Sequence, residues 1–130
     1  MHTATKRPIL DEIVLNDLHF SDAPYAFFDA WRRGVELVGP ELFGTGTREG
    51  LKQAICKWDL RPNMDAIIDA IGVMSSGEKV FLAAMVSFYN AEEGGALLRR
   101  VGVYGLADLG GLDLERRKII AALMLNYSGW

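Results

Sequence analysis

Apolar residues recur every three or four positions along most of this chain, which is the spacing of one face of an α-helix. The clearest case covers residues 24–38, with apolar side chains spaced by four, four and three positions: Phe27, Trp31, Val35 and Val38. Ser21 or Asp22 can cap the start of this helix, and Pro24 suits its first turn. Gly39 and Pro40 then end it, so we expect a helix that starts after residue 22 and stops at residue 38.

The preceding segment, residues 9–18, has two interpretations. Leu10, Val14 and Leu18 fall on one helical stripe, and Ile9 and Ile13 fall on the neighbouring stripe. The short apolar run EIVL is also compatible with a β-strand. We expect a helix here and keep the strand as the alternative.

Four downstream segments repeat the helical period. Thr47 can cap a helix over residues 48–61 whose apolar stripe has the spacing i, i+3, i+4, i+7: Leu51, Ala54, Ile55 and Trp58. Asn63 can cap residues 64–71, with Asp65 and Asp69 outward and these residues inward: Met64, Ile67, Ile68 and Ile71.

Ser75 and Glu78 form the pattern of a capping box ahead of the most apolar stripe in the chain, which predicts the central helix. That stripe contains Phe81, Ala84, Met85 and Phe88. Residues 91–100 form a shorter helix weakened by two glycines. Asp113 caps the last helix, which we expect to bury Ile119, Ile120, Leu123, Met124 and Tyr127.

These segments predict an all-α protein: a compact bundle of six to seven short helices, with one glycine-rich connection before the C-terminal helix. Alternating apolar runs joined by hairpin turns, which a β-sheet protein needs, are mostly absent. A chain of 130 residues fits one domain, so we expect a single helical domain over residues 1–130 with residues 1–8 flexible.

Composition and charge exclude several classes. The net charge of −3 gives no general attraction to nucleic acid or to anionic membranes, and 50% hydrophobic residues is ordinary for a globular protein. The longest apolar runs reach only seven residues, whereas a membrane span needs about twenty. Cys56 is the only cysteine, so no internal disulfide can form; we expect a cytoplasmic protein with no membrane association.

The glycine-rich loops fail the patterns of known ligand sites. In residues 39–50, Thr45 stands where a phosphate-binding P-loop has lysine, and the three glycines of a dinucleotide fingerprint are misspaced. In residues 108–115, Gly110, Leu112 and Asp113 occupy positions where a calcium loop needs oxygen, oxygen and glycine. We therefore expect no cofactor and no metal.

Catalytic groups are also sparse. His2, His19 and Cys56 are scattered, and His19 is most simply a surface hydrogen-bonding residue. The pair Asp65 and Asp69 has the spacing of a solvated helix face. We assign no catalytic residues, and the balance favours a protein that is not an enzyme.

Five basic residues flank the glycine-rich stretch of residues 102–113: Arg99, Arg100, Arg116, Arg117 and Lys118. They can converge on a patch for phosphate or an acidic partner, or pair locally with nearby acidic residues. A helix–turn–helix arrangement fits poorly, because the connection is about twelve residues instead of three or four.

Tyr104 and Trp130 do not lie on the core stripes. Tyrosine and tryptophan beside glycine often serve as contact residues, although Trp130 can equally fold back onto the core. We expect a protein–protein interaction module, including possible self-association as a homo-oligomer, whose surface contains Tyr104, Trp130 and the five basic residues. The alternatives are a nucleic-acid-associated regulator that uses this basic patch and a small-ligand pocket between helices.

Overall fold

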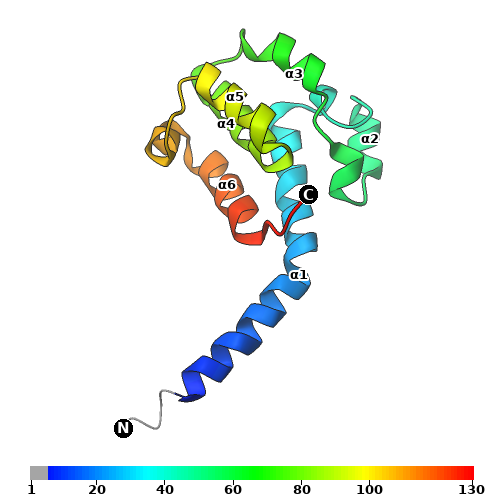
Figure 1. Ribbon diagram of the computed structural model, residues 1–130. Coiled ribbons are helices and arrows are strands. Elements are labelled where there is room, and N and C mark those ends of the chain that lie inside the picture. Colours follow the sequence, from blue (N-terminus) through cyan, green and yellow to red (C-terminus); the bar gives the residue numbers. More distant parts are fainter. Residues whose placement is uncertain (1–5) are drawn as a thin grey trace.

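The computed structural model describes residues 6–130, with side chains from residue 11 onward, and confirms the all-α prediction (Figure 1). Within this part of the chain there are six α-helices, three short 3-10 segments and no strand. The elements are α1 (Lys6–Val38), η2 (Pro40–Leu42), α2 (Arg48–Gln53), η3 (Lys57–Leu60), α3 (Met64–Ile71), α4 (Ser76–Tyr89), α5 (Ala91–Arg100), η4 (Leu106–Gly111) and α6 (Leu114–Asn126). The predicted flexibility of residues 1–8 falls mostly outside the described residues, and helix α1 begins at Lys6.

The first helix differs from the prediction. We expected a new helix to start at Ser21 or Asp22, and kept a strand as the alternative upstream, but α1 is one helix of 33 residues with Pro24 inside it. Proline removes one backbone hydrogen bond and disfavours the helical conformation before it, yet helices tolerate it at some cost. The start signal at Ser21 therefore does not begin a new helix, and α1 ends at Val38, just before Gly39, whose φ of 123° suits glycine.

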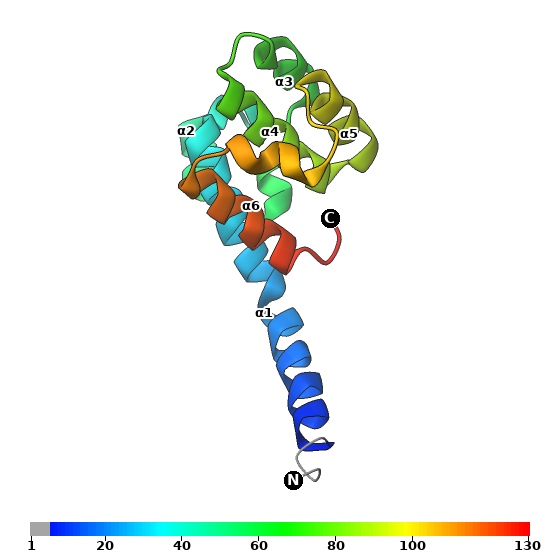
Figure 2. The ribbon, with the colours of Figure 1, turned by 90° about the vertical axis from the view of Figure 1, so that its left-hand side faces the viewer.

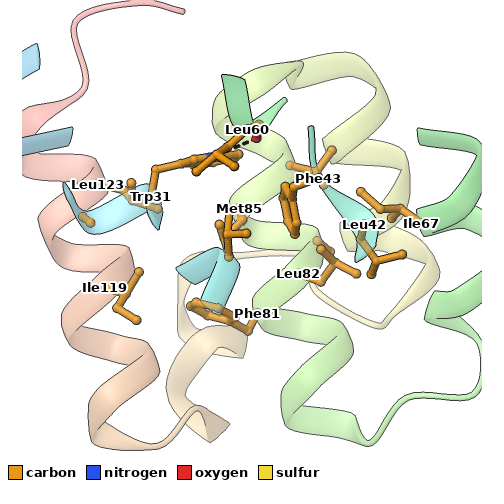
Figure 3. Close-up of a cluster of buried hydrophobic side chains, with 14 of the residues drawn as sticks. Trp31, Leu42, Phe43, Leu60, Ile67, Phe81, Leu82, Met85, Ile119 and Leu123 are labelled. Carbon is orange, nitrogen blue, oxygen red and sulfur yellow. Dashed lines mark hydrogen bonds between the residues drawn. The ribbon is translucent and has the colours of Figure 1, made fainter. Parts of the chain in front are cut away.

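Helix α4 lies at the centre of the core, as its sequence pattern predicts. The run from Phe81 to Val86 is buried throughout. Figure 3 shows Met85 and Phe81 facing Trp31 of α1 and Ile119 of α6. The indole Nε1 of Trp31 donates a hydrogen bond of 2.9 Å to the carbonyl oxygen of Leu60, which satisfies a buried donor.

The segment after Thr47 is a second correction. The Thr47 hydroxyl accepts a hydrogen bond from the Gly50 amide as predicted, but α2 ends at Gln53 and the chain runs extended before η3. Ile55, expected on a buried stripe, is therefore 84% exposed, and Trp58 is exposed as well. Side chains from elsewhere take over the backbone groups that a longer helix would use: Asp59 accepts from the Ile55 amide, and Arg32 donates to the Ala54 carbonyl.

The remaining caps mostly follow the sequence. Ser75 and Glu78 make the reciprocal capping box, and Asp113 accepts from the Arg116 amide at the start of α6. Asn63 precedes α3 but makes no side-chain cap; its amide donates to the Gly44 carbonyl instead. On α3, Ile68 is partly exposed and not inward as predicted.

Helices α4 and α5 approach each other closely at one glycine. A Cβ atom placed on Gly94 would lie 2.3 Å from the Ser87 Cα atom, inside any allowed contact distance. A Cβ atom on the neighbouring Gly95 would meet only the end of the flexible Arg99 side chain, at 3.7 Å. Gly94 therefore sets the distance between the two helices, whereas Gly95 does not.

The C-terminus returns to α1 instead of extending into solvent (Figures 1 and 2). The Trp130 ring lies 4.8 Å from the Trp31 ring and 5.0 Å from the Tyr89 ring, centroid to centroid. The Lys57 ammonium group lies over the Trp130 ring and donates to the Gly129 carbonyl. Burial lowers the pKa of Lys57 from its usual value, with a smaller opposing effect from Cys56.

Candidate functional site

The glycine-rich stretch between α5 and α6 forms a fixed arch. At its start the Asp108 carboxylate accepts hydrogen bonds from the backbone amides of Tyr104 and Gly105. At its end the Arg117 guanidinium donates to the carbonyl oxygens of Leu112 and Gly110. Each end is thus held by one charged side chain, and η4, which the sequence did not predict, forms between them.

A groove of about 770 Å³ lies beneath this arch. Residues of α4 form its base, residues of α5 and α6 form its two sides, and η4 closes it between those sides. Figure 2 shows how these four elements are arranged. Its lining is mainly apolar and includes Phe88, Leu98, Leu109 and Ile120. Met124 belongs to this groove and is 62% exposed, so the prediction that it is buried in the core is wrong. A pocket of this size and character is typical of sites for small molecules.

The five basic residues flanking the arch do not form one patch. Arg116 pairs with Asp113 at 2.6 Å and lies over the Phe81 ring, and Arg100 donates to the Ile68 carbonyl on α3. Arg99 and Arg117 line the groove. The Lys118 side chain is exposed and makes no hydrogen bond or ion pair within residues 11–130.

Tyr104 and Trp130 have opposite orientations. Tyr104 sits at the groove mouth and is 79% exposed, whereas Trp130 packs into the aromatic cluster around Phe27 and Trp31. The predicted surface is therefore divided: Tyr104 faces outward, and the Trp130 ring belongs to the fold.

A second feature, which the sequence reasoning did not identify as a site, is the N-terminal part of α1. Residues 6–22, here called the arm, project beyond the rest of the molecule in both views (Figures 1 and 2). Five large apolar side chains in the arm are each 52–63% exposed: Ile13, Val14, Leu15, Leu18 and Phe20. Tyr25, just beyond the arm, is also exposed. The signal was present in the stripes of residues 9–18, but periodicity does not say whether a stripe is covered.

The arm continues the face of α1 that the core uses. Ile13 and Phe20 precede the buried Phe27 by fourteen and seven residues, which places all three on nearly the same side of the helix. Helix α6 covers this face near Phe27 but ends at Asn126. The last contact between the two helices on this side is a hydrogen bond of 2.8 Å between His19 Nε2 and the Leu125 carbonyl oxygen, near the end of α6.

Within the described residues nothing suggests metal binding or a membrane crossing. No group of three or more histidine, cysteine or acidic residues is close enough to hold a metal ion in that part of the chain. No helix between residues 6 and 130 is both long enough and apolar enough to cross a bilayer. His19 serves as a hydrogen-bonding residue between two helices, and Cys56 is the half-buried residue ahead of η3.

Comparison of the chain with protein-family models, with curated proteins and with solved structures found no match in any of the three.

Proposed function

We propose that this protein is an association module that forms a dimer of two identical chains through the arm of α1. The observation that supports the proposal is the exposed apolar surface of the arm. A helical segment of this length is marginal in water on its own, because helices in proteins gain most of their stability by packing an apolar face. A partner that covers the arm supplies this packing.

The exposed apolar side chains of the arm lie on two sides of the helix. Ile13 and Phe20 continue the core-facing side of α1. Val14, Leu18 and Tyr25 follow one another at spacings of four and seven residues, which places them together on another side, and each is more than half exposed. Burying this surface favours association through the hydrophobic effect.

The charge distribution of the arm favours a second copy in antiparallel orientation. The arm begins with Lys6 and Arg7, and its acidic residues follow: Asp11, Glu12, Asp17 and Asp22. Antiparallel pairing brings the basic start of each helix against the acidic end of the other. Parallel pairing would place like charges together at each level of the helix.

A two-fold axis then has a defined position. If Arg7 of one chain faces Asp22 of the other, the axis passes halfway between them, beside Val14 and Leu15. Such an interface is self-complementary, as two-fold dimers require. Val14 of the two chains would meet near the centre.

The test is the molar mass in solution, measured by size-exclusion chromatography with light scattering at about 10–200 µM protein. The chain mass is 14.4 kDa, and we expect the wild-type protein to have twice that mass. The double variant Val14→Glu/Leu18→Glu should be a monomer. Leu106→Glu is the matched control, because Leu106 is an exposed apolar residue outside the arm, and it should remain a dimer.

Two results would contradict the proposal: a monomeric wild-type protein throughout this range, or a dimer that survives the double substitution. Orientation is tested separately with Val14→Cys in a Cys56→Ser background. Antiparallel pairing predicts rapid disulfide cross-linking at residue 14. It also predicts that Lys6→Glu/Arg7→Glu and Asp17→Lys/Asp22→Lys chains prefer each other over themselves.

A further inference from the structure

The geometry points to the groove beneath the arch as a binding site for a small amphipathic molecule with an aliphatic body and a single carboxylate, the chemistry of a fatty acid. This site is separate from the arm and does not depend on dimer formation.

Two glycines, Gly105 and Gly110, contribute to the wall of the groove, and a Cβ atom on either would meet no atom within 4 Å. Neither has a positive φ, so their backbone conformations do not require glycine. The arch is held at both ends by Asp108 and Arg117, so the space beneath it is preformed rather than created by a ligand.

The lining favours an aliphatic ligand. Leu98, Leu109, Ile120 and Met124 come from three different elements and face the same space, and Phe88 closes the base. Leu106 at the mouth is 82% exposed. A hydrocarbon chain bound in the groove would shield its own apolar surface and the exposed apolar side chains at the mouth from water.

The charges favour an anionic head group. Two arginines line the groove, Arg99 and Arg117, and no aspartate or glutamate does. Arg117 is committed to the arch, where it donates to two carbonyl groups. The Arg99 side chain forms no ion pair or hydrogen bond within residues 11–130, so its guanidinium is free to pair with a carboxylate at the groove edge.

The experiment measures binding by isothermal titration calorimetry with three probes of one chain length: dodecanoate and dodecyltrimethylammonium below their micelle concentrations, and dodecanol below its solubility limit. We expect dodecanoate to bind at least tenfold more tightly than dodecanol, and the cation to bind most weakly. Equal affinity for the three probes, or no dodecanoate binding up to 1 mM, would overturn the assignment.

Substitutions locate the site. Gly110→Leu fills the groove and should weaken dodecanoate binding more than tenfold. Gly111→Leu is the matched control, because Gly111 is the next residue of η4, has equally open surroundings and does not line the groove. Gly105→Leu provides a second filling variant, and a thermal unfolding curve checks that each is folded.

The head group is tested at two adjacent arginines. Arg99→Gln should weaken dodecanoate binding about tenfold and leave dodecanol unchanged, whereas Arg100→Gln should change neither, because Arg100 is directed toward α3. If Gly110→Leu or Arg99→Gln binds dodecanoate as the wild-type protein does, the fatty acid binds elsewhere and the assignment fails. Repeating the titration with the monomeric Val14→Glu/Leu18→Glu variant separates this result from the fate of the dimer.

Discussion

The two halves of α1 have similar apolar patterns and opposite surroundings. In the second half, Phe27, Trp31 and Val35 are fully or almost fully buried, whereas in the arm Ile13 and Phe20, on nearly the same side of the helix, are more than half exposed. The difference arises from the neighbours: α4, α6 and the C-terminal residues surround the second half, whereas the end of α6 reaches the arm only at His19. A helical stripe therefore identifies the side of the helix that packs, and the rest of the chain decides whether anything packs on it.

Substituting one aromatic or aliphatic residue in each half should give the largest contrast. Trp31→Ala removes a fully buried ring and leaves the Leu60 carbonyl without its donor, so we expect a loss of about 3–5 kcal/mol in the free energy of unfolding. Val14→Ala, in the arm, should change the unfolding of the monomeric body by less than about 0.5 kcal/mol.

Urea denaturation followed by circular dichroism measures both, at a concentration where light scattering shows monomer. Similar losses for the two variants would mean that the arm packs on the body in solution, and the contrast between the halves would be lost.

The sequence predicted the packed parts of the fold better than the exposed ones. The central position of α4 and the caps at Ser75 and Asp113 followed from local patterns, because those residues satisfy their own helix ends. The end of α2 could not be predicted, since it depends on Arg32 and Asp59 reaching backbone groups from other elements. One of these side chains, Arg32, is distant in the sequence, and the other, Asp59, acts only because residues 54–56 have left the helix.

The candidate sites divide in the same way. The sequence drew attention to the glycine-rich stretch and to Tyr104, but no local pattern revealed that Asp108 and Arg117 hold this stretch as an arch over a groove. Nor could periodicity show that α6 ends at Asn126 and leaves Phe20 uncovered. Both features depend on where separate elements end in space.

A pair of neighbouring glycines in the body tests whether close packing controls stability there. Gly94→Ala places a methyl group against the Ser87 backbone, and overpacking of this kind costs about 1–3 kcal/mol. Gly95→Ala meets only a flexible side chain and should gain up to about 1 kcal/mol from its higher helix propensity. Thermal and urea unfolding measure both; a stabilising Gly94→Ala would show that α4 and α5 can separate at little cost.

Pro24 lies at the junction of the two halves of α1, and replacing it should make the helix of the arm more stable and so closer in stability to the buried half. Proline has no N–H group, so the Phe20 carbonyl lacks its usual donor four residues later. Pro24→Ala restores that donor, and we expect a gain of about 1 kcal/mol in local helix stability. This is less than the full cost of about 3 kcal/mol for proline relative to alanine inside a helix.

Hydrogen exchange measured by mass spectrometry should show slower exchange of arm amides in this variant. Pro8→Ala is the control, because Pro8 lies in the first turn, where the amide has no partner within the helix. Slower exchange in Pro8→Ala but not in Pro24→Ala would contradict the assignment of Pro24 as the weak point between the halves.

Acid should weaken the body through two of its helix caps. Hydrogen bonds from Ser75 lower the pKa of Glu78, and hydrogen bonds from the backbone and side chain of Arg116 lower the pKa of Asp113. Because both carboxylates have a lower pKa in the folded state than in the unfolded chain, their contribution to stability is present above the unfolded values of about 4. It is lost as the pH falls through the lower folded values. We expect the free energy of unfolding of Glu78→Gln/Asp113→Asn to depend less steeply on pH below 4 than that of the wild-type protein. Urea unfolding from pH 7 to pH 3 measures this. Parallel curves of unfolding free energy against pH for the two proteins would show that the caps of α4 and α6 do not contribute to the pH dependence of stability.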